Sequence, residues 1–113
     1  MISIYHNPRC SKSRQGLSLL EESGKEFEII KYLEDKLSIE KLEDIITKLK
    51  ITPIDLVRKN EAIWKSDYKG KTLSDKEIIK AMVDNPKLIE RPIVINGTNA
   101  VVGRPPETIL SII

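Results

Sequence analysis

A single cysteine, Cys10, and a single histidine, His6, lie four residues apart near the start of the sequence. A cysteine thiolate is a strong nucleophile, and positive charge nearby lowers the pKa of the thiol. Arg9, Lys12 and Arg14 lie within four residues of Cys10, and a protonated His6 would add to their effect. We therefore predict a reactive thiolate. The alternative is a structural cysteine, because free cysteine is among the residue types most often buried in protein cores.

The residues after Cys10 predict a helix over 11–23 that ends at Gly24, so Cys10 lies at or just before its N-terminus. Unpaired N–H groups and the helix dipole at such a position stabilise a thiolate and can also bind an oxyanion. The arginine that a phosphatase loop needs six residues after its cysteine is replaced by Gly16. The Cys10-x-x-Ser13 spacing corresponds to a redox motif with a hydroxyl in place of its second sulfur. An external thiol must then resolve any adduct on Cys10.

The composition predicts one compact domain of 113 residues, with 40% hydrophobic and 32% charged residues. Lys and Arg exceed Asp and Glu by 19 − 17 = 2, which is too small an excess for a typical nucleic-acid-binding protein. One cysteine and one histidine exclude an intrachain disulfide and a structural zinc site. The chain lacks a signal-peptide pattern and a run of about 18 apolar residues. We therefore expect a cytoplasmic protein that uses neither a membrane nor a metal.

Hydrophobic periodicity and turn residues predict an alternating α/β chain. Strands are expected over 2–5, over 27–32, and in a hairpin of 93–95 and 100–102. Helices are expected over 11–23 and 39–49, from Thr52-Pro53, from the Ser74/Glu77 capping box to Asn85, and from Pro105 to Ile113. The order β-α-β, several helices, then β-β-α predicts a small mixed sheet with helical material inserted in the middle of the chain.

Four segments of the sequence resemble the glutathione- and glutaredoxin-coupled arsenate reductases, the ArsC-like family, and occur in that family's order. The segments are His6-Asn7-Pro8-Arg9-Cys10-Ser11-Lys12-Ser13-Arg14, Leu56-Val57-Arg58-Lys59-Asn60, Glu90-Arg91-Pro92-Ile93-Val94 and Gly103-Arg104-Pro105-Pro106-Glu107. The resemblance implies a thioredoxin-like fold, formed by residues 1–113 as a single domain with a helical insertion at about 34–89. One departure is Ser11-Lys12, where family members commonly carry a small residue and a threonine.

The resemblance also assigns roles to individual residues. It implies that Cys10 is the nucleophile and that His6 helps to hold it as a thiolate. Three arginines would bind arsenate, each guanidinium contacting two oxygens: Arg58, Arg91 and Arg104. Supporting roles fall to residues that shape the loop, hydrogen-bond the thiolate or follow a cis peptide bond: Asn7 with Pro8, Ser13, Arg14 and Pro92. Taken singly, Arg58 also fits a solvent-exposed helix position, and Arg104 a cap on the hairpin.

The implied reaction reduces arsenate to arsenite, as in arsenic detoxification. Glutathione serves as co-substrate, glutaredoxin as the reducing partner, and no cofactor is bound. Two alternatives stay open. One is a transcription regulator of the Spx type, which resembles this family and contacts RNA polymerase, although such regulators lack the His-Asn-Pro-x-Cys segment with its arginines. The other is a monothiol thioltransferase that acts on glutathione adducts.

Overall fold

The computed structural model describes residues 2–113 and divides them into two compact units. Unit 1 consists of the described residues up to Asp35 together with Arg91–Ile113. Unit 2 consists of Lys36–Glu90. Cys10 and residues that hydrogen-bond it, among them Asn7, Arg91 and Arg104, belong to unit 1.

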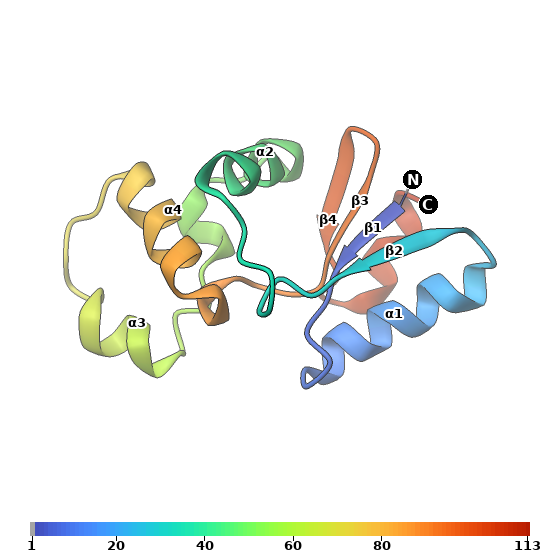
Figure 1. Cartoon of the computed structure of the whole chain (residues 1–113), viewed down its shortest axis with the longest axis horizontal. Helices are drawn as coiled ribbons and strands as arrows, with labels where there is room; N and C mark the ends of the chain where they lie inside the picture. The colour runs from blue at the N-terminus through green and yellow to red at the C-terminus, as the bar shows by residue number, and fades with distance from the viewer. Residues whose placement is uncertain (1) are drawn as a thin grey trace. The chain divides into compact units, whose positions relative to one another are not determined.

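Unit 1 is built on a mixed sheet that, within residues 2–113, has four strands in the order β2-β1-β3-β4 (Figure 1). The strands are β1 (Ile2–Tyr5), β2 (Phe27–Ile30), β3 (Ile93–Asn96) and β4 (Asn99–Val102). Strand β1 pairs in parallel with β2 and antiparallel with β3, and the hairpin partner β4 continues the sheet. Parallel neighbours need a crossover connection, and the helix between β1 and β2 supplies it.

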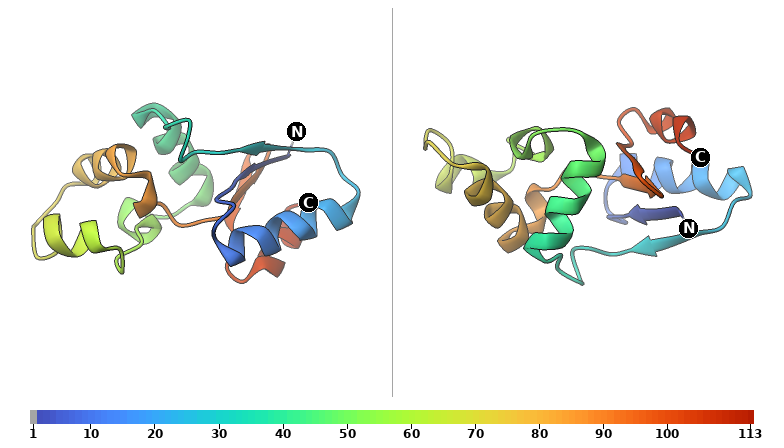
Figure 2. Two further views of the ribbon diagram at one scale, coloured as in Figure 1. Left: turned by 60° about the horizontal axis from the view of Figure 1, so that its bottom comes forward. Right: turned by 90° about the horizontal axis from the view of Figure 1, so that it is seen from above.

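That crossover helix, α1 (Ser11–Ser23), and the C-terminal 3-10 helix η3 (Pro106–Ser111) lie on the same side of the sheet (Figure 2). Both elements contribute to the core of unit 1, which contains the buried side chains Ile2, Ile4, Leu20, Val94 and Ile109. Helix α1 ends at Gly24, whose φ of 72° is in the left-handed region that favours glycine. The sheet and α1 together fix where the β1–α1 loop begins and ends.

Two elements of unit 1 are shorter or tighter than predicted. The strand expected to reach Tyr32 ends at Ile30, because the carbonyl of Lys31 accepts hydrogen bonds from Glu34 and Asp35 and turns the chain. The C-terminal helix expected to reach Ile113 is a 3-10 helix that ends at Ser111. The Ile112 carbonyl accepts a 2.7 Å hydrogen bond from the Asn96 side chain, so this last segment is tied to the hairpin.

Unit 2 is helical, with α2 (Ile39–Leu49), η1 (Pro53–Leu56), α3 (Ala62–Asp67), α4 (Asp75–Asp84) and η2 (Pro86–Leu88). Ser38 caps α2, and Ser74 with Glu77 forms the predicted capping box of α4. The helices of unit 2 bury a set of apolar side chains that includes Leu42, Ile45, Leu56, Met82 and Leu88. Helix α3 was not predicted from the sequence.

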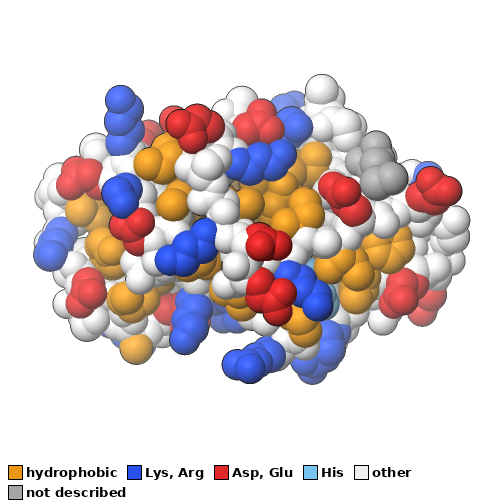
Figure 3. All heavy atoms as spheres, in the orientation of Figure 1, with side chains coloured by type: hydrophobic (Ala, Val, Ile, Leu, Met, Phe, Trp, Pro, Cys, Tyr) orange, Lys and Arg blue, Asp and Glu red, His pale blue; other side chains and the backbone are white. Residues whose placement is uncertain are grey.

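The charged side chains are mixed in sign over the surface that Figure 3 displays, with Lys and Arg interspersed among Asp and Glu. This agrees with the small net charge of +2. Across residues 2–113, no helix combines the length and apolar character that crossing a bilayer requires.

Candidate active site

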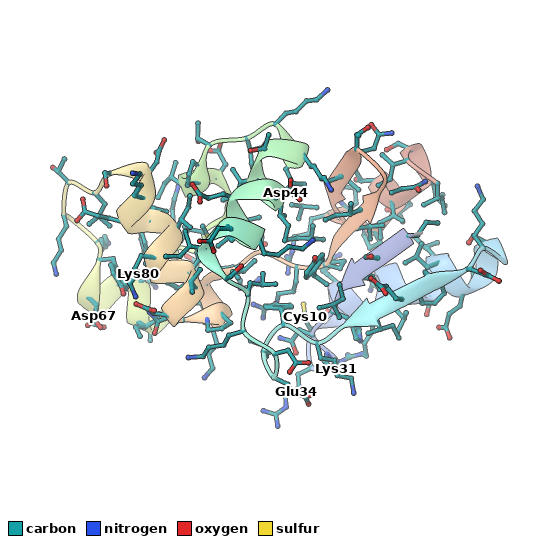
Figure 4. The ribbon with its side chains drawn as sticks, turned by 45° about the horizontal axis from the view of Figure 1, so that its top comes forward. Cys10, Lys31, Glu34, Asp44, Asp67 and Lys80 are labelled. Carbon is teal, nitrogen blue, oxygen red and sulfur yellow. The ribbon has the colours of Figure 1, made fainter. Side chains whose placement is uncertain are left out.

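Cys10 is the N-cap residue of α1, with extended backbone angles of φ −95° and ψ 123°. Its carbonyl accepts the first helical hydrogen bond from Arg14, and its N–H donates to the Asn7 carbonyl. Because β1 and β2 are parallel, the β1–α1 loop and the turn after β2 lie at the same end of the sheet, where Figure 4 labels Cys10 and Lys31. The thiol is half-buried.

A buried hydrogen-bond frame holds the loop in front of Cys10. The hydroxyl of Ser13 accepts a 2.9 Å hydrogen bond from the Asn7 N–H and lies 2.7 Å from His6 Nδ1. His6, Asn7 and Ser13 are all buried. The Asn7 side chain in turn accepts from the Arg9 N–H at 3.0 Å, and Arg14 donates from Nη1 to the Pro8 carbonyl at 2.9 Å. The first turn of α1 and the loop are thereby joined at several points.

Two distant arginines reach the sulfur. Arg104 donates from Nη2 to Cys10 Sγ at 3.6 Å and from Nε to the Arg91 carbonyl at 2.9 Å. The Arg91 side chain also hydrogen-bonds the Cys10 thiolate and adds its positive charge. The structure thus brings Arg91 and Arg104, two of the three arginines predicted to bind an oxyanion, to the predicted nucleophile.

The pKa of Cys10 lies below its ordinary value. Burial of the thiol raises the pKa, but hydrogen bonding from the backbone N–H of Ser13, the hydrogen bond and charge of Arg91, and the backbone N–H of Lys12 together outweigh that effect. The predicted helix N-terminus and one of the predicted arginines therefore both favour the thiolate, which is the nucleophilic form of cysteine.

Replacing Arg91 by alanine should raise the pKa of Cys10, because one hydrogen bond and one positive charge are removed from the thiolate. Alkylation of Cys10 by iodoacetamide, followed between pH 5 and 10, measures this; we expect the rate at pH 7 to fall several-fold. Arg9→Ala is the matched control, since it removes a cation adjacent to Cys10 in the sequence but none of the groups that lower the pKa. Equal profiles for Arg91→Ala and the wild type would contradict this assignment.

The pKa of His6 is shifted in the direction that disfavours its charged form. Its pKa is lowered from 6.5 because burial, followed by the charges of Lys31 and Arg14, disfavours the imidazolium, although a hydrogen bond with Ser13 opposes the shift. This shift favours the neutral imidazole at neutral pH, and the role of His6 in holding the Cys10 thiolate stays a prediction from the resemblance. The structure shows His6 Nδ1 in contact with the Ser13 hydroxyl.

The free energy of unfolding should decrease on acidification, because the pKa of His6 is lower in the folded than in the unfolded chain. In the unfolded chain the imidazole protonates near pH 6.5, whereas in the fold its pKa is lower, so the unfolded state binds more protons in between. The stabilisation is therefore complete above about pH 6.5 and is lost as the pH falls through the folded pKa. Urea unfolding at pH 7.5, 6.5 and 5.5 should show this slope in the wild type and a weaker slope in His6→Gln; identical slopes would exclude His6 as its source.

The peptide bond before Pro92 is cis, as the family resemblance implies, and the bond before Pro105 is also cis, which the sequence did not lead us to expect. Arg58 belongs to unit 2, where its guanidinium lies 3.9 Å from Glu61 and 3.7 Å from Glu90. Its role toward the oxyanion stays a prediction from the resemblance.

Sequence reasoning missed two kinds of residue near this site. Lys31 was not singled out, although its place directly after a strand parallel to β1 puts it at the same end of the sheet as His6. Gly16 and Gly103 were also passed over as positions of close approach; a Cβ on either would lie 2.9 Å from Pro92 Cγ. A glycine inside a helix with no turn to explain it was the available signal for Gly16.

Comparison with known proteins gives consistent matches over the whole chain. The ArsC family matches residues 5–112. The chain is 46% identical to YfgD of Escherichia coli, described as uncharacterised, over 99% of this chain and 96% of that protein. It is 45% identical to an arsenate reductase of Haemophilus influenzae, over 99% and 98%. Among solved structures, an arsenate reductase from Vibrio cholerae matches with a TM-score of 0.95 and 44% identity, over 99% of this chain and 97% of that chain.

These comparisons confirm the predicted fold class. The chain is a mixed α/β protein with a thioredoxin-like fold, in which a β-α-β segment and a β-β-α segment share one sheet and helices lie between them in the sequence.

Proposed function

Because this chain belongs to the ArsC family, we propose that it is an arsenate reductase in which the Cys10 thiolate attacks the arsenic atom. The observation that carries the proposal is the convergence of Arg91 and Arg104 on a cysteine whose pKa is lowered. Relatives named arsenate reductase, 40–45% identical over nearly the full chain, support the same substrate. In this proposal the protein acts in the cytoplasm, where its thiol stays reduced.

Arsenate is a compact oxyanion with several acceptor oxygens, and two guanidinium groups beside the sulfur suit it. Arginine stays charged at every relevant pH and can contact two oxygens at once. In our proposal Arg91 and Arg104 hold the oxyanion against Sγ and stabilise the charge that develops as the sulfur attacks. The resemblance also implies a role for Arg58 in binding arsenate. In the proposal, hydrogen bonds of Asn7, Ser13 and Arg14 keep the β1–α1 loop in place. Pro92, the next residue in the chain, positions Arg91.

The reaction begins when Sγ forms a bond to arsenic and one arsenate oxygen leaves as water. The thiol of glutathione then attacks Cys10 Sγ. A sulfur–sulfur bond forms as the sulfur–arsenic bond breaks, the electron pair of the broken bond passes to arsenic, and arsenite is released. In total, arsenate and two thiols give arsenite, a disulfide and water. Glutaredoxin reduces the resulting mixed disulfide and returns Cys10 to the thiolate.

The number of cysteines in the sequence is the reason for proposing an external electron donor. With one cysteine in the chain, no second sulfur of the same molecule can resolve the adduct on Cys10. Ser13, three residues on, has the place of a resolving cysteine, but its hydroxyl is engaged with His6 and Asn7. The donor must therefore be an external thiol, and following the family resemblance we assign glutathione as co-substrate and glutaredoxin as partner, with neither a bound cofactor nor a metal in the reaction.

The proposal is tested by following NADPH oxidation that depends on arsenate, in the presence of glutathione, glutathione reductase and glutaredoxin. We expect turnover that requires all three components besides the protein. Turnover with thioredoxin and its reductase in place of glutathione would overturn the assigned donor. Absence of arsenate turnover with either donor would overturn the function.

The same assay separates the two alternatives. A monothiol thioltransferase would consume NADPH with hydroxyethyl disulfide and glutathione but not with arsenate. A transcription regulator of the Spx type would show neither activity. The convergence of two arginines on the thiol favours the arsenate reductase, because neither alternative needs a site for a small oxyanion.

A further inference from the structure

The ring of Pro92 lies between two glycines that come from distant parts of unit 1. A Cβ placed on Gly16, in the interior of α1, would lie 2.9 Å from Pro92 Cγ, and one placed on Gly103, after β4, would also lie 2.9 Å from it. Either Cβ would also meet Ile109 Cδ1, at 2.9 Å and 3.0 Å. Real Cβ atoms do not approach other atoms this closely, so glycine is what allows the proline ring to sit here.

This glycine–proline contact is connected to the sulfur on both sides. On one side, Gly16 lies on the same helix as Cys10, which is its N-cap residue. On the other side, Pro92 directly follows Arg91 in the chain, and its carbonyl accepts a 2.8 Å hydrogen bond from the Gly103 N–H. Arg104, next after Gly103, binds the Arg91 carbonyl and Cys10 Sγ. One series of contacts thus runs from Cys10 through α1 to Pro92. A second runs from Pro92 through the two arginines back to Cys10.

We propose that Gly16 and Gly103 are positioning residues that, through Pro92, set the distance between the Cys10 thiolate and the guanidinium groups of Arg91 and Arg104. The proposal deepens the proposed function, since the two arginines are the ones assigned to arsenate. Of the two side chains that an added Cβ would meet, the end of Ile109 can move aside by rotation. The proline ring is rigid and bonded to Arg91, so its displacement moves the arginine.

The contact between Gly16 and Pro92 also predicts how Gly16→Ala changes the melting temperature. Glycine in a helix interior is less favourable than alanine because it loses more backbone entropy on folding. Because Gly16 is buried, replacing it by alanine would not change the contact of this position with water. If the site had room for a methyl group, Gly16→Ala would therefore raise the melting temperature. The contact with Pro92 predicts the opposite sign.

The deciding measurement is the pH profile of Cys10 alkylation by iodoacetamide in Gly16→Ala, with the melting temperature recorded alongside. We expect the profile to move to higher pH, with a rate at pH 7 that is lower by about threefold or more, because Arg91 moves away from the thiolate. Leu17→Ala is the matched control. It alters the neighbouring residue of α1, which packs on the core, and should lower the melting temperature while leaving the profile in place.

A second variant keeps the test decisive if Gly16→Ala does not fold. Ile109→Val removes the Cδ1 atom, so in that background an alanine at position 16 or 103 meets mainly the proline ring. The profile should be unchanged in Ile109→Val and shifted upward in Gly16→Ala/Ile109→Val and in Gly103→Ala/Ile109→Val. An unshifted profile in folded glycine variants, or an equal shift in Leu17→Ala, would overturn the proposal. Since alkylation needs no arsenate, failure of the arsenate assay would contradict the proposed function and leave this result standing.

Discussion

Replacing Cys10 by serine should lower arsenate turnover by at least about a thousandfold, to the level of the reaction without the protein. The hydroxyl of serine keeps the shape of the side chain but is not ionised near neutral pH, so the sulfur–arsenic bond has no counterpart. The helix dipole, the backbone N–H groups and Arg91, which lower the pKa of the thiol, cannot make a strong nucleophile of a hydroxyl. The measurement is NADPH oxidation with glutathione and glutaredoxin at saturating arsenate.

The variant should fold normally, because serine is among the preferred N-cap residues and Cys10 is the N-cap of α1. Circular dichroism and the melting temperature serve as the control for folding. Oxyanion binding should also persist, since the two arginines are unchanged. Turnover within tenfold of the wild type would show that the sulfur is not the attacking atom.

The second large effect is expected for Arg104→Ala, which should lower kcat/KM for arsenate about a hundredfold. Its guanidinium donates at once to Cys10 Sγ and to the Arg91 carbonyl, so its removal takes away a contact to the reacting atom and a support of the neighbouring arginine. Loss of one preorganised donor at a developing negative charge typically costs about 10²–10³ in rate. Steady-state kinetics over a range of arsenate concentrations give the value.

Arg104→Lys distinguishes charge from geometry. Lysine restores the positive charge but presents one ammonium group, which cannot take the place of Nε and Nη2 together. We expect it to recover only a small part of the loss. Arg9→Ala removes an exposed arginine that is not among the groups found to hydrogen-bond the sulfur or to lower its pKa, and it should change kcat/KM less than about threefold. A full recovery in Arg104→Lys would contradict the two-point contact.

The parts of the fold that could be predicted are those whose signals are local. Gly24 ends α1, and Ser74 with Glu77 begins α4, because capping depends on residues three or four positions apart. Helix α3 could not be found in this way. It has six residues, too few for hydrophobic periodicity, and its buried Trp64 stacks on Tyr68 at a ring distance of 5.4 Å. Such an element depends on packing rather than on its own propensity.

The residues of the candidate site likewise differ in whether local signals in the sequence could reveal them. The neighbourhood of Cys10 follows from one short segment, so its position at the helix N-terminus was accessible from the sequence. Arg104 is 94 residues away from Cys10, and only the family resemblance pointed to it. The charge of His6 depends on how deeply the fold buries it and on Lys31, a neighbour from another strand end. No spacing rule reports burial, so the direction in which the pKa of His6 shifts could not be predicted from the sequence.

The place of Cys10 at the start of α1 ties reactivity to folding by proton linkage. A thiol whose pKa is lowered in the fold contributes stability that is complete above its unfolded pKa and lost as the pH falls through its folded pKa. Protonation of the sulfur removes that contribution from the first turn of the helix. Relative to the protonated thiol, the thiolate is thus the form that stabilises the N-terminal end of α1, so the charge that makes Cys10 a nucleophile also contributes to the stability of the helix that carries it.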